Sequence, residues 1–195
     1  MIHATEGKLH WNYFIALERD LELASRYVEF SKRNFDTYSI EFAHLLFAAA
    51  SEVDVIAKLL CRRLKPAAKR ENINHYRAVI LAAFPYFDKL RVSVPRYGLT
   101  LQPWENWTKE TKLNPFWWQC YNNVKHERDI HFHEATLKNV LNALSALLIL
   151  THVHYSYELA QGAAHPRLLP LDTTHALQPE LTLFHFAGDR FYKYV

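Results

Sequence analysis

Glycine is scarce in this chain: 4 glycines stand among its 195 residues, and they never cluster. A phosphate-binding loop needs clustered glycines so that backbone N–H groups can approach the phosphates. The Gly-x-Ser-x-Gly turn that holds the nucleophile of many hydrolases is also missing. Phosphate-loop chemistry and hydrolytic-triad chemistry therefore both lack their sequence signatures.

Cysteine is equally rare, with Cys61 and Cys120 far apart and outside any Cys-x-x-Cys pair. This usage is typical of a reduced, intracellular protein. The N-terminus has no basic start followed by an apolar run, which a signal peptide would need. The longest apolar run, 143–150, is too short to span a bilayer. From these absences we expect a cytoplasmic protein without a membrane segment.

No charge of one sign dominates, because 23 Lys and Arg stand against 20 Asp and Glu, for a formal net charge of +3. A dedicated duplex-DNA-binding protein usually carries a denser basic stripe. The composition therefore permits contact with nucleic acid without requiring it. Hydrophobic residues are abundant, at 50% of the chain, and their long periodic segments predict a mostly helical fold.

The spacing of apolar residues predicts a series of helices. They are expected over 9–34, 40–64, 75–84, 115–127 and 134–161. Ser39 is expected to cap the second helix, and Asn72 or Asn74 the third. Asn114 is expected to cap the fourth helix, with Pro115 at its first position.

Two short alternating segments, 91–94 and 99–101, predict a β-hairpin inserted among the helices. A tryptophan-containing loop, 102–114, follows the hairpin. We expect Trp104 and Trp107 to cover an edge of the core rather than to stack on a base.

The residues after the last helix, 163–195, contain several prolines and show weak periodicity. They predict an irregular C-terminal arm packed on the same domain. Within this arm, 184–186 and 191–195 alternate, so a terminal hairpin is expected. We therefore predict one helical-bundle domain over 1–162, with a β-hairpin insertion at about 91–101, and the arm.

The most polar stretch, Tyr121–Glu134, lies between two apolar helical segments. Its core, 125–134, holds three histidines, two basic residues and three acids. A solvated turn and a functional site are both open interpretations. Metal binding would use His131 and His133, but further ligands are missing nearby in the sequence, so we expect no metal and no other cofactor.

Arg128 and His133 suit another chemistry, phosphodiester cleavage without a metal. A cation offsets the charge that builds on the phosphate oxygens in the transition state, and a histidine moves a proton near neutral pH. If the substrate's own 2′-hydroxyl is the nucleophile, the substrate must be RNA.

Glu52 is unusual because it lies on an apolar face of the helix expected over 40–64. A buried carboxylate is costly unless a cation or hydrogen-bond donors pair with it. Glu52 therefore needs a partner from elsewhere in the fold, unless only its stem is buried and its head reaches water. Asp54 lies on a more mixed face of the same helix.

The motif Arg128-x4-His133, with the polar Asp129 directly after the arginine, resembles that of the HEPN superfamily. In that superfamily the motif lies between the end of one helix and the start of the last long one, as expected here. The wider pattern Trp-x-x-Tyr-Asn-x-x-Lys-His-x-Arg at 118–128 resembles uncharacterised bacterial members. The resemblance covers roughly residues 10–160 and leaves out the hairpin and the tail.

The resemblance implies a helical domain that forms a homodimer in which two Arg/His pairs face one cleft. It implies metal-independent cleavage of RNA by a toxin or phage-defence effector, with an antitoxin protein as a further partner. Some members are inactive scaffolds, so binding of RNA, nucleotide or a protein partner without cleavage is the alternative. A purely structural hydrogen-bond network in the polar run is a third interpretation.

The resemblance also implies roles for individual residues. Arg128 would bind the scissile phosphate, His133 would act as general acid or base, and Asp129 would orient one of them. Glu52, with Asp54 as second choice, is the candidate for an acid that contacts Arg128. The residues expected to bind substrate are Asn122, Lys125, His126 and His131. Of these, His131 is expected to support the other side chains rather than to contact the substrate directly.

Overall fold

The computed structural model describes residues 7–108, 113–160, 177 and 181–186, and for 158–160 the backbone alone. The helices of these residues are α1 (Leu9–Ala24), α2 (Ile40–Leu64), α3 (Ile73–Ala83), α4 (Phe116–His126), α5 (Arg128–His131) and α6 (Leu137–Ala160). Short 3-10 helices are η1 (Lys32–Asn34), η2 (Phe87–Lys89), η3 (Pro95–Tyr97) and η4 (Phe132–Glu134). The strands are β1 (Val92–Val94), β2 (Leu99–Leu101) and β3 (His185–Phe186).

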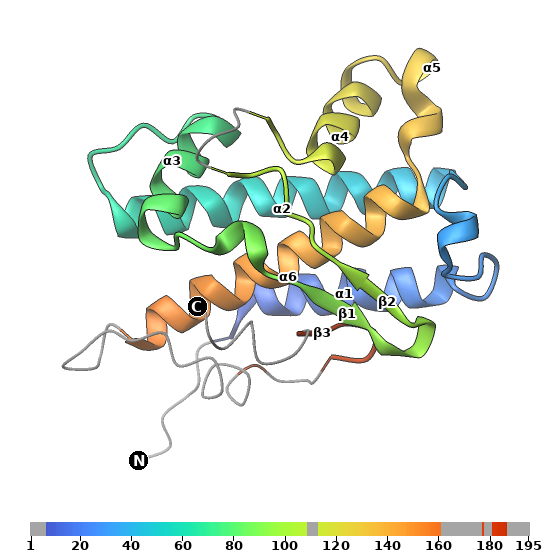
Figure 1. The fold of residues 1–195 in the computed structure, drawn as a ribbon, viewed down its shortest axis with the longest axis horizontal. Helices are drawn as coiled ribbons and strands as arrows, with labels where there is room; N and C mark the ends of the chain where they lie inside the picture. Colours follow the sequence, from blue (N-terminus) through green and yellow to red (C-terminus); the bar gives the residue numbers. More distant parts are fainter. Residues whose placement is uncertain (1–6, 109–112, 161–176, 178–180, 187–195) are drawn as a thin grey trace.

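Helices α2 and α6 form the centre of the molecule and pack along one another (Figure 1). Every residue of α6 from Asn139 to Ser156 is buried, because other elements cover that helix on all sides. Helix α1 packs against both central helices, α3 against α2, and α4 against both. The predicted mostly helical fold with a small β insertion is thus confirmed.

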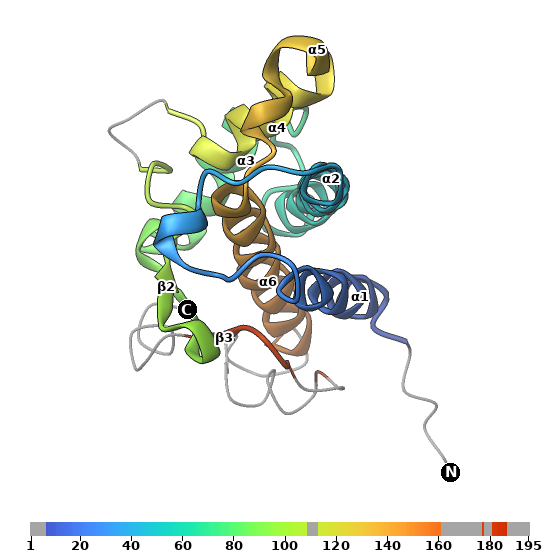
Figure 2. The ribbon, with the colours of Figure 1, turned by 90° about the vertical axis from the view of Figure 1, so that its right-hand side faces the viewer.

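The sheet has three antiparallel strands in the order β2-β1-β3 and lies on the opposite side of the bundle from α5 (Figure 2). The predicted hairpin is confirmed, with Val92 opposite Leu101 and Val94 opposite Leu99. Gly98 closes it at a φ of 62°, which glycine adopts without strain. Strand β3 pairs with β1. The second half of the expected terminal hairpin, 191–195, lies outside the described residues.

The first helix is shorter than its apolar spacing predicts, because α1 ends at Ala24 and not at residue 34. The Ser25 hydroxyl donates a hydrogen bond to the Glu22 carbonyl at 2.6 Å and competes with the helical pattern there. Val28 and Phe35, which continue the apolar stripe in the sequence, still pack against the core. These side chains reach the core from turns, so their spacing imitates a helical stripe.

The local capping signals are correct at α2 and α3 but not at α4. Ser39 accepts a hydrogen bond from the Phe42 N–H at 3.1 Å, and α2 spans the predicted 40–64. Asn72 accepts from two backbone N–H groups, so α3 begins two residues earlier than expected. Pro115 occupies the N-cap position of α4, and the buried Asn114 side-chain oxygen has no hydrogen bond within the described part of the chain.

The loop tryptophans belong to the core itself, although the sequence predicted that they would cover its edge. Trp104 and Trp107 are both fully buried, with ring centres 4.5 Å apart. Trp117 of α4 meets Trp104 edge-on and donates its indole N–H to the Pro103 carbonyl at 2.8 Å. This aromatic cluster holds the start of α4 against the bundle and so helps to position the polar run that follows.

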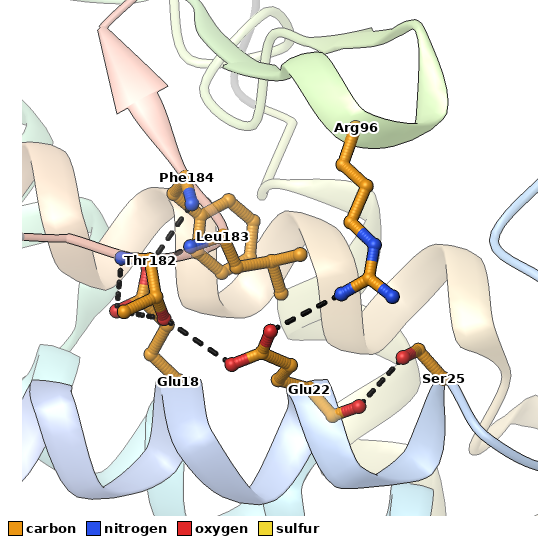
Figure 3. A network of polar contacts seen from close by, with 7 residues as sticks. All are labelled: Glu18, Glu22, Ser25, Arg96, Thr182, Leu183 and Phe184. Atoms are coloured by element: carbon orange, nitrogen blue, oxygen red, sulfur yellow. Dashed lines mark hydrogen bonds and ion pairs between the residues drawn. The ribbon is translucent and has the colours of Figure 1, made fainter.

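A buried carboxylate binds the segment 181–186 to α1 (Figure 3). Glu18 is fully buried and accepts hydrogen bonds from the backbone N–H groups of Leu183 and Phe184, both at 3.0 Å. Its other oxygen accepts from the Thr182 N–H at 3.2 Å. Backbone donors thus satisfy the charge, and this part of the predicted C-terminal arm is attached to the helical domain.

None of the helices described here is both long and apolar enough to cross a membrane.

Candidate functional site

The polar run forms α5 and η4, a short helical excursion that projects beyond α4 and α6 (Figures 1 and 2). Glu127 both ends α4 and precedes α5, and its non-helical backbone, with φ −136° and ψ 57°, turns the chain. Helix α6 consequently begins at Leu137, three residues later than the sequence predicts. Most side chains from Lys125 to Ile130 are exposed, so this excursion presents charge to solvent.

Glu134 organises the inner side of this excursion. Its carboxylate contacts His131 Nδ1 at 2.7 Å and accepts a hydrogen bond from the Asn123 amide at 2.9 Å. Asn139 donates to the Glu134 backbone carbonyl at 2.8 Å. Burial opposes ionisation of Glu134, but hydrogen bonds from Asn123, His131 and Cys120 outweigh it and lower the pKa. The network therefore holds α4, η4 and α6 together around an ionised acid.

Arg128 lies on the outer side, next to the N-terminal part of α2. Its guanidinium carbon lies 5.1 Å from the centre of the Phe47 ring, a cation–π contact. Arg128 and Asp129 line one wall of a groove of about 560 Å³, together with Ile40, Ala43, His44 and Phe132. Neither the Arg128 side chain nor the Asp129 side chain forms a hydrogen bond or ion pair with any residue that the structure describes. The charge of Arg128 is thus not neutralised within the described chain.

His133 is exposed in η4, on the same excursion as Arg128. Its ring centre lies 6.3 Å from that of His131. Over the described ranges, no hydrogen bond joins His133 to Arg128 or to Asp129. The two residues of the motif are therefore presented together on one exposed segment, but no hydrogen bond joins them within the described part of the chain.

His44 is a residue of this groove that the sequence reasoning did not identify. It lies on α2, its side chain is 65% exposed, and its Nδ1 lies 3.8 Å from a Glu41 oxygen. The fold brings it to the groove wall that faces Arg128 and Asp129. In the sequence, His44 is visible only as a histidine on the polar side of α2. It points to a site only when α5 is seen to lie beside that side of α2.

The expected substrate-binding residues divide into two groups. Lys125 and His126 are exposed in the last turn of α4, with the Lys125 ammonium 5.4 Å from the Tyr121 ring centre. Asn122 instead donates a hydrogen bond to the Trp118 carbonyl of its own helix at 3.1 Å. His131 lies between the carboxylates of Glu127 and Glu134.

The acid expected to contact Arg128 is not found at Glu52 or Asp54. Glu52 is 15% exposed and pairs with His10 Nδ1 of α1 at 2.5 Å. Asp54 accepts a hydrogen bond from the Tyr76 hydroxyl at 2.7 Å and forms an ion pair with Lys58. The reason is geometric: Glu52 follows Phe47 by five residues, which turns it about 140° around α2 and toward α1.

Three or more side chains placed to hold a metal ion together do not occur among the residues described here. Comparisons of this chain with protein-family models, with curated proteins and with solved structures found no match. The functional assignment therefore depends on the chemistry of Arg128, Asp129 and His133 and on the groove beside them.

Proposed function

We propose that this protein is a metal-independent endoribonuclease of the HEPN type, which acts as a homodimer and as a toxin or phage-defence effector. The observation that carries the proposal is the exposed guanidinium of Arg128, which lies beside a groove and has no carboxylate partner among the described residues. Its planar group suits two oxygens of a phosphate. His133 follows five residues later on the same exposed segment.

In the proposed reaction, the 2′-hydroxyl oxygen of RNA attacks the adjacent phosphorus. A base takes the hydroxyl proton, the bond from the 2′-oxygen to phosphorus forms, and the bond from phosphorus to the 5′-oxygen breaks. An acid protonates the departing 5′-oxygen, so the products are a 2′,3′-cyclic phosphate and a 5′-hydroxyl. His133 serves as the acid or base, and Arg128 offsets the negative charge of the transition state.

Other residues of the excursion have supporting roles in this proposal. Asp129 lines the groove next to Arg128 and orients Arg128 or His133. His44, on the opposite wall, contributes a second imidazole. The exposed side chains of Lys125 and His126, in the last turn of α4, extend the path for the phosphate backbone.

The apolar surface beside the groove supports the homodimer. Ile40 lines the groove with 67% of its surface exposed, and Ile130 of α5 is 63% exposed. Tyr38 is 50% exposed and meets Phe132 edge-on at 5.6 Å. Large apolar side chains gathered next to a functional group are typical of an interface. A second copy covering them would bring its own Arg128 and His133 to the same cleft.

The same apolar side chains favour the alternative function, an inactive scaffold that binds RNA, a nucleotide or a protein partner such as an antitoxin. In that case Arg128 would bind a ligand and His133 would have no chemical role. Cleavage and binding assays on the same set of variants separate the two functions.

The test is cleavage of labelled single-stranded RNA in the presence of EDTA. We expect the wild-type protein to cut and to leave a 2′,3′-cyclic phosphate. Arg128→Ala and His133→Ala should each lower the rate at least about 100-fold, because each removes stabilisation or proton transfer in the transition state. Arg62→Ala and His75→Ala remove the same kinds of side chain from α2 and α3, far from the groove, and should cut normally.

Wild-type rates in both Arg128→Ala and His133→Ala would refute this site. RNA binding that depends on Arg128, without cleavage by the wild-type protein, would instead identify the scaffold. Rates that fall equally in the Arg62→Ala and His75→Ala controls would show a general effect on folding or charge rather than a site.

A further inference from the structure

A groove with two lysines on its rim lies between the end of α2 and α3, at the opposite end of α2 from the Arg128 groove (Figure 1). It has a volume of about 420 Å³. Lys65 and Lys69 line it on one side, and Ala78, Val79 and Ala82 of α3 give it an apolar side. We call it the basic groove. A ligand that fits it therefore has to combine negative charge with a small apolar part.

The net charge of the chain is concentrated around this groove. The segment from Lys65 to Arg77 holds four Lys and Arg residues and one acid, Glu71. That excess equals the formal net charge of the whole chain, +3, so the charges of all other residues cancel. Glu71 is not among the described residues that line the groove, and none of these carries a carboxylate. Positive charge gathered on one part of a surface in this way favours a polyanion.

The fold holds these lysines in place without neutralising them. Arg70 donates hydrogen bonds to the carbonyls of Pro66 and Ala68, at 2.8 and 3.3 Å, and so braces the connector between Lys65 and Lys69. Both lysines are exposed, and neither side chain forms a hydrogen bond or ion pair with a residue that the structure describes. Their ammonium groups are therefore free to contact an anion.

An exposed face of α2 leads from the Arg128 groove to the basic groove. Its exposed residues recur every three, four or seven positions: His44, Ser51, Val55, Lys58 and Lys65. Because an α-helix has about 3.6 residues per turn, they lie on one side of α2, and His44 to Lys65 spans about 32 Å. Asp54, which flanks this face, is already paired with Lys58 and Tyr76. An extended polyanion bound at Arg128 can therefore follow this face to Lys65.

We propose that the basic groove binds single-stranded RNA whose chain extends along α2 from the Arg128 groove. The inference rests on the proposed function, because it extends the binding site for the same substrate. Lys65 and Lys69 contact phosphate oxygens, and the apolar side at Ala78 and Ala82 packs against an unpaired base. In a duplex the bases are stacked inside the helix and cannot reach this surface, so the groove favours a single strand.

The experiment measures the binding of 2′-O-methyl oligouridines of roughly 4 to 16 nucleotides at about 0.1 M salt. They lack a free 2′-hydroxyl, so the proposed reaction cannot cut them. The affinity of the wild-type protein should rise with length until a strand reaches both grooves. Lys65→Gln/Lys69→Gln should weaken binding of the longest strand at least about tenfold and reduce the slope of log affinity against log salt by about 1.4, because two phosphate contacts are lost.

The matched control is Lys32→Gln/Arg33→Gln, which removes two exposed cations of η1. Phe30, two residues before η1, packs on the Tyr97 ring of η3 with 4.9 Å between the ring centres, so the pair lies close to the sheet. At about 0.1 M salt, charges separated by more than about 10 Å are largely screened from one another. The control should therefore bind within about twofold of the wild-type protein.

Two further measurements separate charge and substrate binding from other effects. Lys65→Arg/Lys69→Arg keeps both charges and should retain most of the affinity. With cleavable RNA, Lys65→Gln/Lys69→Gln should raise KM for a long strand and leave kcat near the wild-type value, because these contacts are the same in the ground state and in the transition state.

The basic groove is refuted as an RNA site if Lys65→Gln/Lys69→Gln binds like the wild-type protein, if the η1 control weakens binding as much, or if a duplex of the same length binds as tightly as the single strand. Binding that depends on both lysines, without any RNA cleavage by the wild-type protein, would refute the nuclease and keep this site. Cleavage of long RNA with the same KM in the wild-type protein and the variant would refute this site and keep the nuclease.

Discussion

The guanidinium carbon of Arg128 lies 5.1 Å from the centre of the Phe47 ring, so α2 provides an aromatic surface for the exposed cation of α5. Phe47 itself packs edge-on against Tyr121 of α4 at 6.0 Å. The ring is thus held between two elements and restricts where Arg128 can lie. Because an aromatic contact leaves the N–H donors of arginine unused, the cation is positioned without losing its capacity to bind phosphate.

Phe47→Leu should reduce the function of Arg128 without unfolding the protein. Leucine keeps most of the apolar contact but removes the ring face, which contributes about 0.5–2 kcal/mol to holding a cation. We expect the rate of RNA cleavage at saturating substrate to fall about threefold to thirtyfold. Phe47→Tyr keeps the ring face and should retain the wild-type rate. If kcat falls equally in Phe47→Tyr, which keeps the ring face, the cation–π contact is not the cause. Phe47 would then act through packing alone.

Ile130→Asp should separate the proposed homodimer into monomers. The substitution places a charge on an apolar side chain that is 63% exposed beside the groove and that the dimer would bury. Light scattering after size-exclusion chromatography should show a dimer for the wild-type protein and at least about a tenfold weaker association for the variant. Leu113→Asp changes a comparably exposed residue, at 61%, and should remain dimeric. A monomeric wild-type protein would contradict the proposed shared cleft.

Glu134→Gln should remove a pH-dependent part of the stability. The pKa of Glu134 is lowered from its ordinary value of 4.5, so its ionised form stabilises the fold above that pH. This contribution is lost as the pH falls below 4.5 and through the lower pKa of the folded state. Urea unfolding should therefore show a larger difference between wild-type protein and variant at neutral pH than in acid.

The control for this measurement is Glu127→Gln, because Glu127 contacts the same histidine but is 63% exposed. We expect its unfolding free energy to stay close to that of the wild-type protein at every pH, since exposed ion pairs contribute little. A constant difference between the wild-type protein and Glu134→Gln across the pH range would contradict the role given to the ionised carboxylate.

Glu18→Ala should destabilise the protein strongly. It would leave the N–H groups of Leu183 and Phe184 without their acceptor and weaken the attachment of the segment 181–186 to α1. We expect a loss of about 3–5 kcal/mol in urea unfolding, as for other buried charged groups that lose their partners. Glu18→Gln keeps one acceptor oxygen and should lose less. Equal losses in the two variants would show that the charge and its bonding pattern are not the cause.

Several features of the fold were predictable because they depend on residues close together in the chain. The limits of α2 follow from the Ser39 cap and from Pro66, which follows the helix. The hairpin around Gly98 follows from two alternating segments and a residue that accepts a positive φ. The polarity of the segment 121–134 left a solvated turn as one interpretation, and Arg128 and His133 are indeed exposed.

Other features required contacts between distant segments. The apolar spacing of Val28 and Phe35 predicted a longer first helix, although these side chains reach the core from turns beyond the end of α1. Glu52 needed a partner, and packing of α1 on α2 supplied His10 instead of Arg128. His44 joined the groove only because α5 packs beside the start of α2.

The sequence by itself determined where the helices begin and end at their capped termini, which faces are apolar, and that the charged run lies between α4 and α6. Capping and periodicity act within one or two turns, so they can be read locally. Only the tertiary structure decided which helix faces meet, and hence that Glu52 pairs with His10 and that Phe47 holds Arg128. Those contacts depend on how α1, α2 and α6 pack together, which no short stretch of the chain contains.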